Sequence, residues 1–243
     1  MPVAEAPGMA NVGIPMGGVG LLSELAIASY LYSSMTTYNA SLEAFRKQTD
    51  GRLSLANRQH RYALVRWLNA WGCRLPRASH GSLVSALEAL PADVPRATKS
   101  WPALPDLGSI DGSAMDHTLF ALCEQLRPFG VRLTAASKLL FALHPDTFVP
   151  WDTGIRKQLR LDPVPGTYRT YLSVVADDVQ QLRRDVGMLG VTLDDIPGLL
   201  QRPDATLPQL MSELYLVRWT RGVRLPNRST ISDWLRWMDC ADD

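Results

Sequence analysis

Apolar residues recur at steps of three or four positions along most of this chain, and no stretch alternates apolar and polar residues as a half-buried strand does. The clearest segment is 55–71, in which Tyr62, Val65 and Leu68 fall on one helical face while arginines lie elsewhere on the wheel. Gly72 follows directly and is the residue type that commonly ends helices. This periodicity predicts an all-α fold.

Proline and glycine, 17 of each, separate the other helical segments. We expect these helices at residues 21–35, 41–48, 82–90, 116–126, 134–143, 152–161, 168–186, 196–200, 207–220 and 230–238. Residues 1–19 are rich in Gly, Pro and Met and are predicted to form a flexible N-terminal arm. Residues 20–243 are expected to form a single helical unit.

The net charge of the whole chain does not call for a polyanionic partner. Lys and Arg number 25 against 24 Asp and Glu, which leaves a net charge of +1. Residues 51–110 differ, because they hold eight basic side chains against three acidic ones. A basic face that binds nucleic acid is therefore compatible with the sequence.

The residue pattern does not support a metal site or a membrane span. The cysteines, Cys73, Cys123 and Cys240, are far apart, and no spacing typical of a zinc or iron–sulfur site occurs. No uninterrupted apolar run of about 18 residues is present, and the N-terminus lacks the basic start of a signal peptide. We expect a cytoplasmic protein with no metal, no cofactor and no membrane contact.

The stretch 129–158 carries the strongest functional signal. A turn at Gly130 precedes a helix of small and apolar residues, and backbone N–H groups at such a helix start can hold a phosphate. A proline-containing break then leads to Asp152, at the start of another helix. An acid in this position is either a helix N-cap or a catalytic carboxylate, and the two roles are compatible.

Three motifs follow one another here: the turn Pro128, Gly130 and Val131, a Thr-Ala-Ala helix start, and the segment Val-Pro-Trp-Asp-Thr-Gly-Ile around Asp152. Together they resemble the helix-hairpin-helix DNA glycosylases, the superfamily of endonuclease III and the 8-oxoguanine DNA glycosylases. The resemblance implies an all-α, two-lobed multi-helix bundle with a degenerate hairpin motif and a cleft between the lobes. The central lobe would span about 56–150, and the second about 20–55 plus 153–243.

The resemblance also assigns roles to particular side chains. Asp152 would be the catalytic carboxylate, acting on a base flipped out of double-stranded DNA. The DNA backbone would be bound by the turn and the following helix, through Gly130, Val131, Arg132, Thr134 and Lys138. The pocket for the flipped base would use tryptophans, for which Trp151, Trp67 and Trp71 are the candidates. Trp67 and Trp71 lie at helical spacing, which is also typical of core residues.

The chain departs from the family pattern at several positions. Leu133 stands nineteen positions before Asp152, where the bifunctional enzymes have a lysine, so no Schiff base can form there. Lys138 does not replace it, because it lies about 140° further round the helix. Phe129 and Val131 occupy glycine positions of the hairpin, and Gly154 stands where the family usually has His.

The resemblance, together with leucine at position 133, implies a monofunctional DNA glycosylase that leaves an abasic site without cleaving the strand. Breaking an N-glycosidic bond develops positive charge on the sugar, which a buried carboxylate stabilises. DNA repair and defence against modified phage DNA are both open as roles. The alternative is a non-catalytic all-α module that binds nucleic acid or protein, in which Asp152 only caps its helix.

Overall fold

The computed structural model describes residues 20–90, 103–104, 112–223 and 225, and every regular element within them is a helix. The first half of the chain forms α1 (Gly20–Met35), α2 (Tyr38–Gln48), α3 (Arg58–Ala70), α4 (His80–Glu88), α6 (Gly112–Leu126) and α7 (Leu133–Leu143). The second half forms α8 (Thr153–Gln158), α9 (Thr167–Gly187), α10 (Ile196–Leu199), α11 (Leu207–Tyr215) and the π-helical η6 (Leu216–Thr220). Short 3-10 turns are η1 (Arg77–Ser79), η4 (Arg127–Phe129) and η5 (Leu193–Asp195). The all-α prediction is confirmed for these residues.

The helix ends follow local chemistry more closely than the apolar periodicity does. Helix α3 begins at Arg58, after the expected residue 55, because the side chain of Asn57 accepts a hydrogen bond from the backbone N–H of Gln59 and caps the helix. Helix α8 ends at Gln158 and not at residue 161, and Arg160 just beyond it has a left-handed φ of 55°. The predicted arm 1–19 and the predicted helix 230–238 lie outside the described residues.

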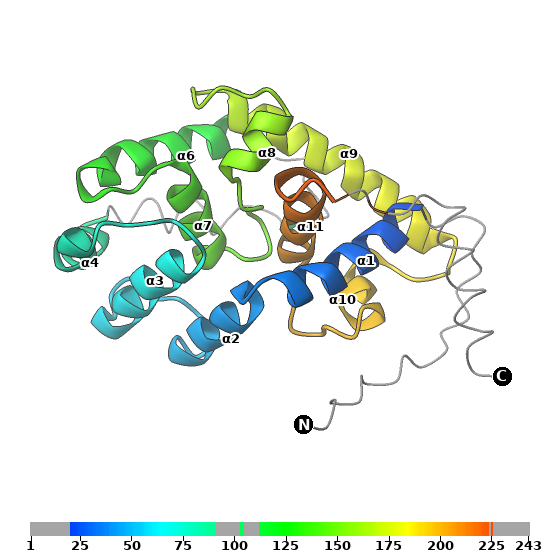
Figure 1. Cartoon of the computed structure of the whole chain (residues 1–243), viewed down its shortest axis with the longest axis horizontal. Coiled ribbons are helices and arrows are strands. Elements are labelled where there is room, and N and C mark those ends of the chain that lie inside the picture. Colours follow the sequence, from blue (N-terminus) through cyan, green and yellow to red (C-terminus); the bar gives the residue numbers. More distant parts are fainter. Residues whose placement is uncertain (1–19, 91–102, 105–111, 224, 226–243) are drawn as a thin grey trace.

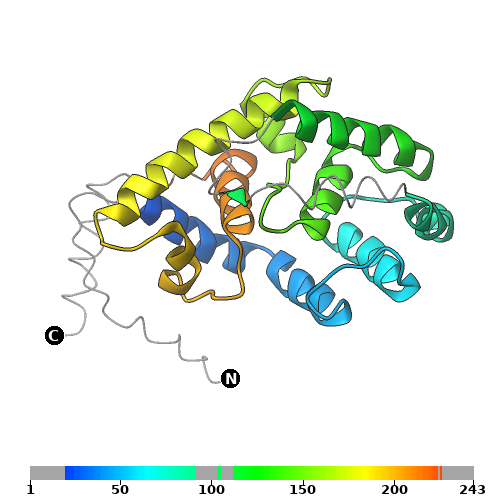
Figure 2. The same ribbon diagram turned by 180° about the vertical axis from the view of Figure 1, so that it is seen from behind.

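The helices pack into one elongated body (Figures 1 and 2). Helix α1 packs against α11 and α9, and α6 packs against both α7 and α9. At one end of the molecule α2, α3 and α4 pack in succession, and α7 joins them to the middle through its contact with α3. None of the described helices is both long enough and apolar enough to cross a membrane.

Helix α11 lies at the centre of the core. Every one of its residues, Leu207–Tyr215, is buried, and Leu210, Met211 and Leu214 are 0% exposed. The buried apolar side chains of all the longer helices form one continuous cluster around it. A division into two lobes with a cleft between them therefore stays a prediction. Truncation of such a core leucine to alanine costs about 2–5 kcal/mol of folding free energy.

A buried ion pair satisfies the one acid that α11 carries into the core. Glu213 is 0% exposed, and its carboxylate accepts hydrogen bonds from the guanidinium of Arg202 and from the amide of Gln209 at 3.1 Å. The same guanidinium donates to the hydroxyl of Ser29 on α1. The ion pair thus links α11, α1 and the loop before α11, and the buried charge of Glu213 is paired.

Asp116 on α6 caps the start of α9 from a distance of some fifty residues in the chain. Its carboxylate accepts hydrogen bonds from the backbone N–H groups of Gly166 at 2.6 Å, Tyr168 at 2.9 Å and Arg169 at 3.3 Å. Asp116 is itself buried, at 5% exposure. The free N–H groups and positive dipole of the helix start stabilise the negative charge, so α6 and α9 are held together.

Asp185 near the end of α9 caps the start of α1. One of its carboxylate oxygens accepts from the backbone N–H groups of Leu21 at 2.9 Å and Leu22 at 3.1 Å. The other accepts from the side-chain amide of Gln181 at 2.7 Å. Asp185 is 0% exposed. The first helix of the described chain is therefore anchored to α9, more than 160 residues later.

Replacement of Asp116 by alanine should lower the free energy of unfolding by about 2–4 kcal/mol, because three N–H groups at the start of α9 lose a charged acceptor. Urea unfolding followed by helical circular dichroism measures this change. Asp177→Ala is the matched control, since Asp177 is an exposed acid on α9 itself. Equal unfolding midpoints for the two variants would show that the remote cap contributes nothing.

Candidate functional site

The turn at Gly130 joins two helices that pack against each other, α6 and α7. Gly130 adopts a left-handed φ of 84°, which glycine reaches without strain, and its N–H bonds back to the carbonyl of Arg127 at 2.9 Å. A Cβ atom at Gly130 would lie 2.5 Å from Cδ of Pro76, so this side of the turn is covered by the segment before α4. Glycine is required here by both the backbone angle and the close contact.

The predicted backbone-binding residues do not share one exposed surface. Val131 is buried at 1% exposure, and Thr134 is half-buried. Arg132 is exposed and occupies the N-cap position of α7, where its side chain makes no capping hydrogen bond. Of this set, Arg132 is the residue whose charge is directed to the surface at the start of α7. The hairpin as a DNA-gripping motif stays a prediction.

Lys138 is enclosed by protein. It is 8% exposed, and its ammonium group donates a hydrogen bond to the backbone carbonyl of Trp71. The nitrogen also lies 5.3 Å from the ring centre of Trp71 and 5.9 Å from that of Tyr38, within range of cation–π attraction. Burial lowers the pKa of Lys138, and the nearby Cys73 and Asp152 oppose that shift in part. Binding of the DNA backbone by Lys138 stays a prediction.

The predicted tryptophans have different surroundings. Trp151 is 0% exposed, stacks on Tyr171 at 6.0 Å and lies in the core next to Asp152. Trp67 is 2% exposed and stacks on Phe45 at 4.9 Å, also in the core. Of the three, Trp71 lines the pocket that also contains Lys138 and Asp152. It ends α3, where the chain turns at Gly72.

Asp152 has two sets of interactions at once. Its Oδ1 accepts a hydrogen bond from the backbone N–H of Ile155 at 2.8 Å, so it is the N-cap of α8. The hydroxyl of Thr220 in η6 lies 3.0 Å from each carboxylate oxygen and can donate to either. The side chain also lines the pocket that contains Lys138. The same carboxylate therefore caps α8 and lines the pocket.

Gly154 lets η6 approach α8 closely enough for that contact. A Cβ atom at Gly154 would lie 2.4 Å from the hydroxyl oxygen of Thr220 and 2.8 Å from its Cβ and methyl carbons. A larger side chain at position 154 would therefore overlap Thr220. The π-helical geometry of η6, a form often found at functional sites, presents Thr220 to Asp152.

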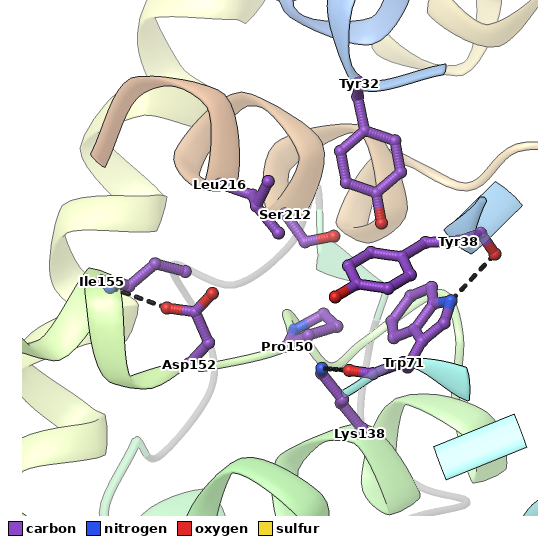
Figure 3. A pocket seen from close by; sticks show the side chains of 9 residues that line it. All are labelled: Tyr32, Tyr38, Trp71, Lys138, Pro150, Asp152, Ile155, Ser212 and Leu216. Carbon is purple, nitrogen blue, oxygen red and sulfur yellow. Dashed lines mark hydrogen bonds between the residues drawn. The ribbon is translucent and has the colours of Figure 1, made fainter. Parts of the chain in front are cut away.

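The pocket lies where helices from both ends of the chain meet (Figure 3). Its lining combines aromatic, apolar and polar side chains: Tyr32, Tyr38, Trp71, Lys138, Pro150, Asp152, Ile155, Ser212 and Leu216. In Figure 3, Asp152 and Lys138 approach the pocket from different sides, with Tyr38 and Ser212 above Pro150 between them. The space available to the centres of water-sized molecules is about 20 Å³, which suits one water. A nucleobase needs the lining side chains to move.

Several of these pocket residues were not predicted from the sequence. Tyr32 and Tyr38 come from the corner between α1 and α2, and Ser212 and Leu216 come from α11 and the start of η6. No local pattern relates them to Asp152, because the nearest of them is sixty residues away in the chain. Burial raises the pKa of Tyr32, with a smaller contribution from Glu213.

No group of three or more His, Cys, Asp or Glu side chains within the described residues is arranged to hold a metal ion. Comparisons with protein-family models, with curated proteins and with solved structures found no match to this chain. We therefore derive a function from the chemistry of the site.

Substitution of Asp152 by asparagine or by alanine should separate the stability contributed by the N-cap hydrogen bond from that contributed by the negative charge. Asparagine is as good an N-cap as aspartate, so we expect Asp152→Asn to stay within about 0.5 kcal/mol of the parent in unfolding free energy. Asp152→Ala loses the cap and should cost about 1 kcal/mol. Denaturant unfolding measures both. If the two variants are equally stable, the bond from Ile155 to Asp152 does not stabilise α8.

Substitution of Gly154 by alanine should push η6 away from α8 and cost about 1–3 kcal/mol, because the new methyl overlaps Thr220. Thr220→Ala removes the hydroxyl and methyl and should recover part of this loss in the double variant. A double-mutant cycle on unfolding free energies should give a coupling of about 0.5 kcal/mol or more. Strict additivity would contradict the close packing of these two residues.

Proposed function

We propose that this protein is a monofunctional DNA glycosylase, which hydrolyses the bond between deoxyribose and a flipped, damaged or modified base in double-stranded DNA. One observation carries the proposal: the Asp152 carboxylate, oriented by Ile155 and Thr220, lines a pocket that also has aromatic walls and a buried ammonium group. The product is an abasic site. A role in DNA repair or in defence against modified phage DNA follows from the same chemistry.

The chemistry requires one well-oriented carboxylate. As the C1′–N bond breaks, its electron pair leaves with the base and positive charge develops on the sugar. Asp152 stabilises that charge electrostatically and accepts the proton of the water that adds to C1′. The departing base takes a proton from solvent. The hydrogen bonds from Ile155 and Thr220 hold the carboxylate in place before the substrate binds, so little reorganisation is needed.

The proposal does not include strand cleavage through a covalent intermediate between a lysine amine and the sugar. Leu133, which stands at the position of the lyase lysine in the resembling enzymes, is an apolar residue at 7% exposure. It offers no nucleophile for a Schiff base with the sugar. Hydrolysis by water alone leaves the DNA strand intact at the abasic site.

A flipped base would enter by displacing side chains of the pocket wall. Tyr38 and Leu216 are only half-buried, and both border the pocket. Tyr38 is the first residue of α2, directly after the break between α1 and α2. Rotation of these two side chains would widen the space between Asp152 and Lys138. Such a change on binding is common in enzymes that take a base out of the helical stack.

Exposed arginines near the turn at Gly130 support an approach of DNA to this side. Pro76 touches Gly130, and Arg74 and Arg77, on either side of Pro76, are both exposed. Arg132, two residues after Gly130, is also exposed. Exposed arginines in these two segments suit phosphate binding, which would depend strongly on salt concentration.

The second candidate is a non-catalytic module that binds nucleic acid. The observation that favours it is the size of the pocket, which takes one water in the present arrangement. In that case Asp152 would serve only as the N-cap of α8, and the arginines around Gly130 would carry the binding. The module would bind DNA with a marked salt dependence and release no base.

Base release from a panel of duplexes, each with one modified or damaged base, tests the proposal. Hot alkali converts every abasic site into a strand break, which gel electrophoresis resolves. We expect Asp152→Asn to keep its fold and to lose at least about 100-fold in single-turnover rate, as enzymes do when one oriented electrostatic group is removed. Asp162→Asn is the matched control, because Asp162 is an exposed acid beyond α8.

One outcome would reject the role of Asp152, and another would reject the glycosylase activity itself. If Asp152→Asn releases base as fast as the parent, the carboxylate has no catalytic role. If the parent releases none of the bases yet binds duplex DNA in a salt-dependent manner, the non-catalytic module is the better description.

A further inference from the structure

The ammonium group of Lys138 is the polar feature of the pocket that the hydrolysis itself does not use. Within the described part of the chain, the ion pairs formed do not include Lys138, and its one hydrogen bond goes to the carbonyl of Trp71. A lysine ammonium carries three N–H donors. Two of them therefore have no hydrogen-bond acceptor among the described residues, in a side chain that is 8% exposed.

Burial of an incompletely hydrogen-bonded ammonium group is unfavourable in free energy. Removal of an ammonium from water costs several kcal/mol, and cation–π attraction to Trp71 and Tyr38 returns only a part of that. The cost also lowers the pKa of Lys138. Buried, incompletely paired titratable groups that line a cavity are typical of binding sites, since a ligand can complete their hydrogen bonds.

The two charged groups of the pocket, Lys138 and Asp152, lie on different sides of it (Figure 3). The ammonium of Lys138 on α7 is a donor, and the hydroxyl of Tyr38 on α2 can also donate. The carboxylate of Asp152 on the side of α8 can only accept when ionised. A nucleotide undergoing hydrolysis has the matching polarity, because positive charge develops on its sugar and negative charge on its departing base.

We propose that Lys138 donates a hydrogen bond to a carbonyl oxygen of the flipped base, and that the pocket thereby selects bases that carry a carbonyl where cytosine and adenine carry an amino group. Uracil and hypoxanthine are such bases, and deamination of cytosine and adenine is the class of reaction that supplies them. This inference rests on the proposed glycosylase function. It assigns to Lys138 the rejection of cytosine and adenine, a discrimination that Asp152 does not make.

The same hydrogen bond assists the departure of the base. When the C1′–N bond breaks, the electron pair moves into the base and is shared with its carbonyl oxygen. The N–H group of Lys138 stabilises that oxygen, and the lysine keeps its proton throughout. Water adds to C1′, its proton passes to Asp152, and the base is protonated by solvent. An amino group at the same place would point its N–H groups at the ammonium, which is also a donor. Neither group would then have a hydrogen-bond acceptor.

Matched pairs of duplexes test the selection. Uracil is compared with cytosine, and hypoxanthine with adenine, each opposite the same partner base and in the same sequence. We expect the parent to release the carbonyl-bearing base at least about 100-fold faster in single turnover, because a site built around a hydrogen bond rejects a base that cannot form it. Equal rates within both pairs would overturn the inference without any variant.

Lys138→Met tests the residue itself. The methionine side chain keeps the volume but has no donor, so the preference within each pair should fall by at least about tenfold. Lys138→Arg, which keeps the donors, should retain more of the preference than methionine does. Lys47→Met is the matched control, since Lys47 is exposed on α2, and its preference should equal that of the parent. Thermal unfolding by circular dichroism checks that each variant is folded.

The failure of this inference and the failure of the proposed function give different results. If release depends on Asp152 but Lys138→Met keeps the full preference, the glycosylase stands and the selection by Lys138 is wrong. If the parent releases no base at all, both are wrong. Borohydride trapping adds a third outcome: a covalent complex of DNA with the parent that Lys138→Met does not form would make Lys138 a nucleophile and overturn its role as a hydrogen-bond donor.

Discussion

Carboxylates at the starts of helices hold this architecture together. Asp185 accepts hydrogen bonds from the free N–H groups of α1, and Asp116 accepts hydrogen bonds from those of α9. Asp152 caps α8 in the same way. The first two act between elements that are far apart in the chain, and both are buried. In each case unsatisfied backbone donors and the helix dipole meet a negative charge, so the same contact satisfies the helix and compensates the buried acid. Helices α1, α6 and α9 are thereby fixed around the central α11.

The pocket depends on that framework. Once Asp185 fixes the start of α1, the far end of α1 and the start of α2 bring Tyr32 and Tyr38 against the end of α3. Helix α11 and its π-helical continuation then supply Thr220, which touches Asp152 through the space left by Gly154. A capping carboxylate thus becomes an oriented group on a cavity wall. Lys138 lies on a different side of the pocket, and the two charges give the pocket its polarity.

Much of the helical structure and one part of the site could be predicted from local sequence. The periodicity of 55–71, the stop at Gly72 and the turn at Gly130 all correspond to elements of the structure, because they express backbone preferences of neighbouring residues. The position of Asp152 at a helix start follows from the same local rules. The end of α8 was not predicted correctly, since the left-handed backbone at Arg160 has no strong signature in the sequence.

Local sequence by itself determined that the chain is helical, where its turns lie and that Asp152 caps a helix. The tertiary structure decided which side chains share a cavity. Helical geometry placed Lys138 away from the face of Leu133, but only the packing of α3 against α7 buried its ammonium beneath Trp71. Trp67, Trp71 and Trp151 are equivalent by residue type, and their contacts alone assign Trp71 to the pocket and the others to the core. The physical reason is that burial depends on which distant surfaces meet, and periodicity within one helix carries no information about its partner.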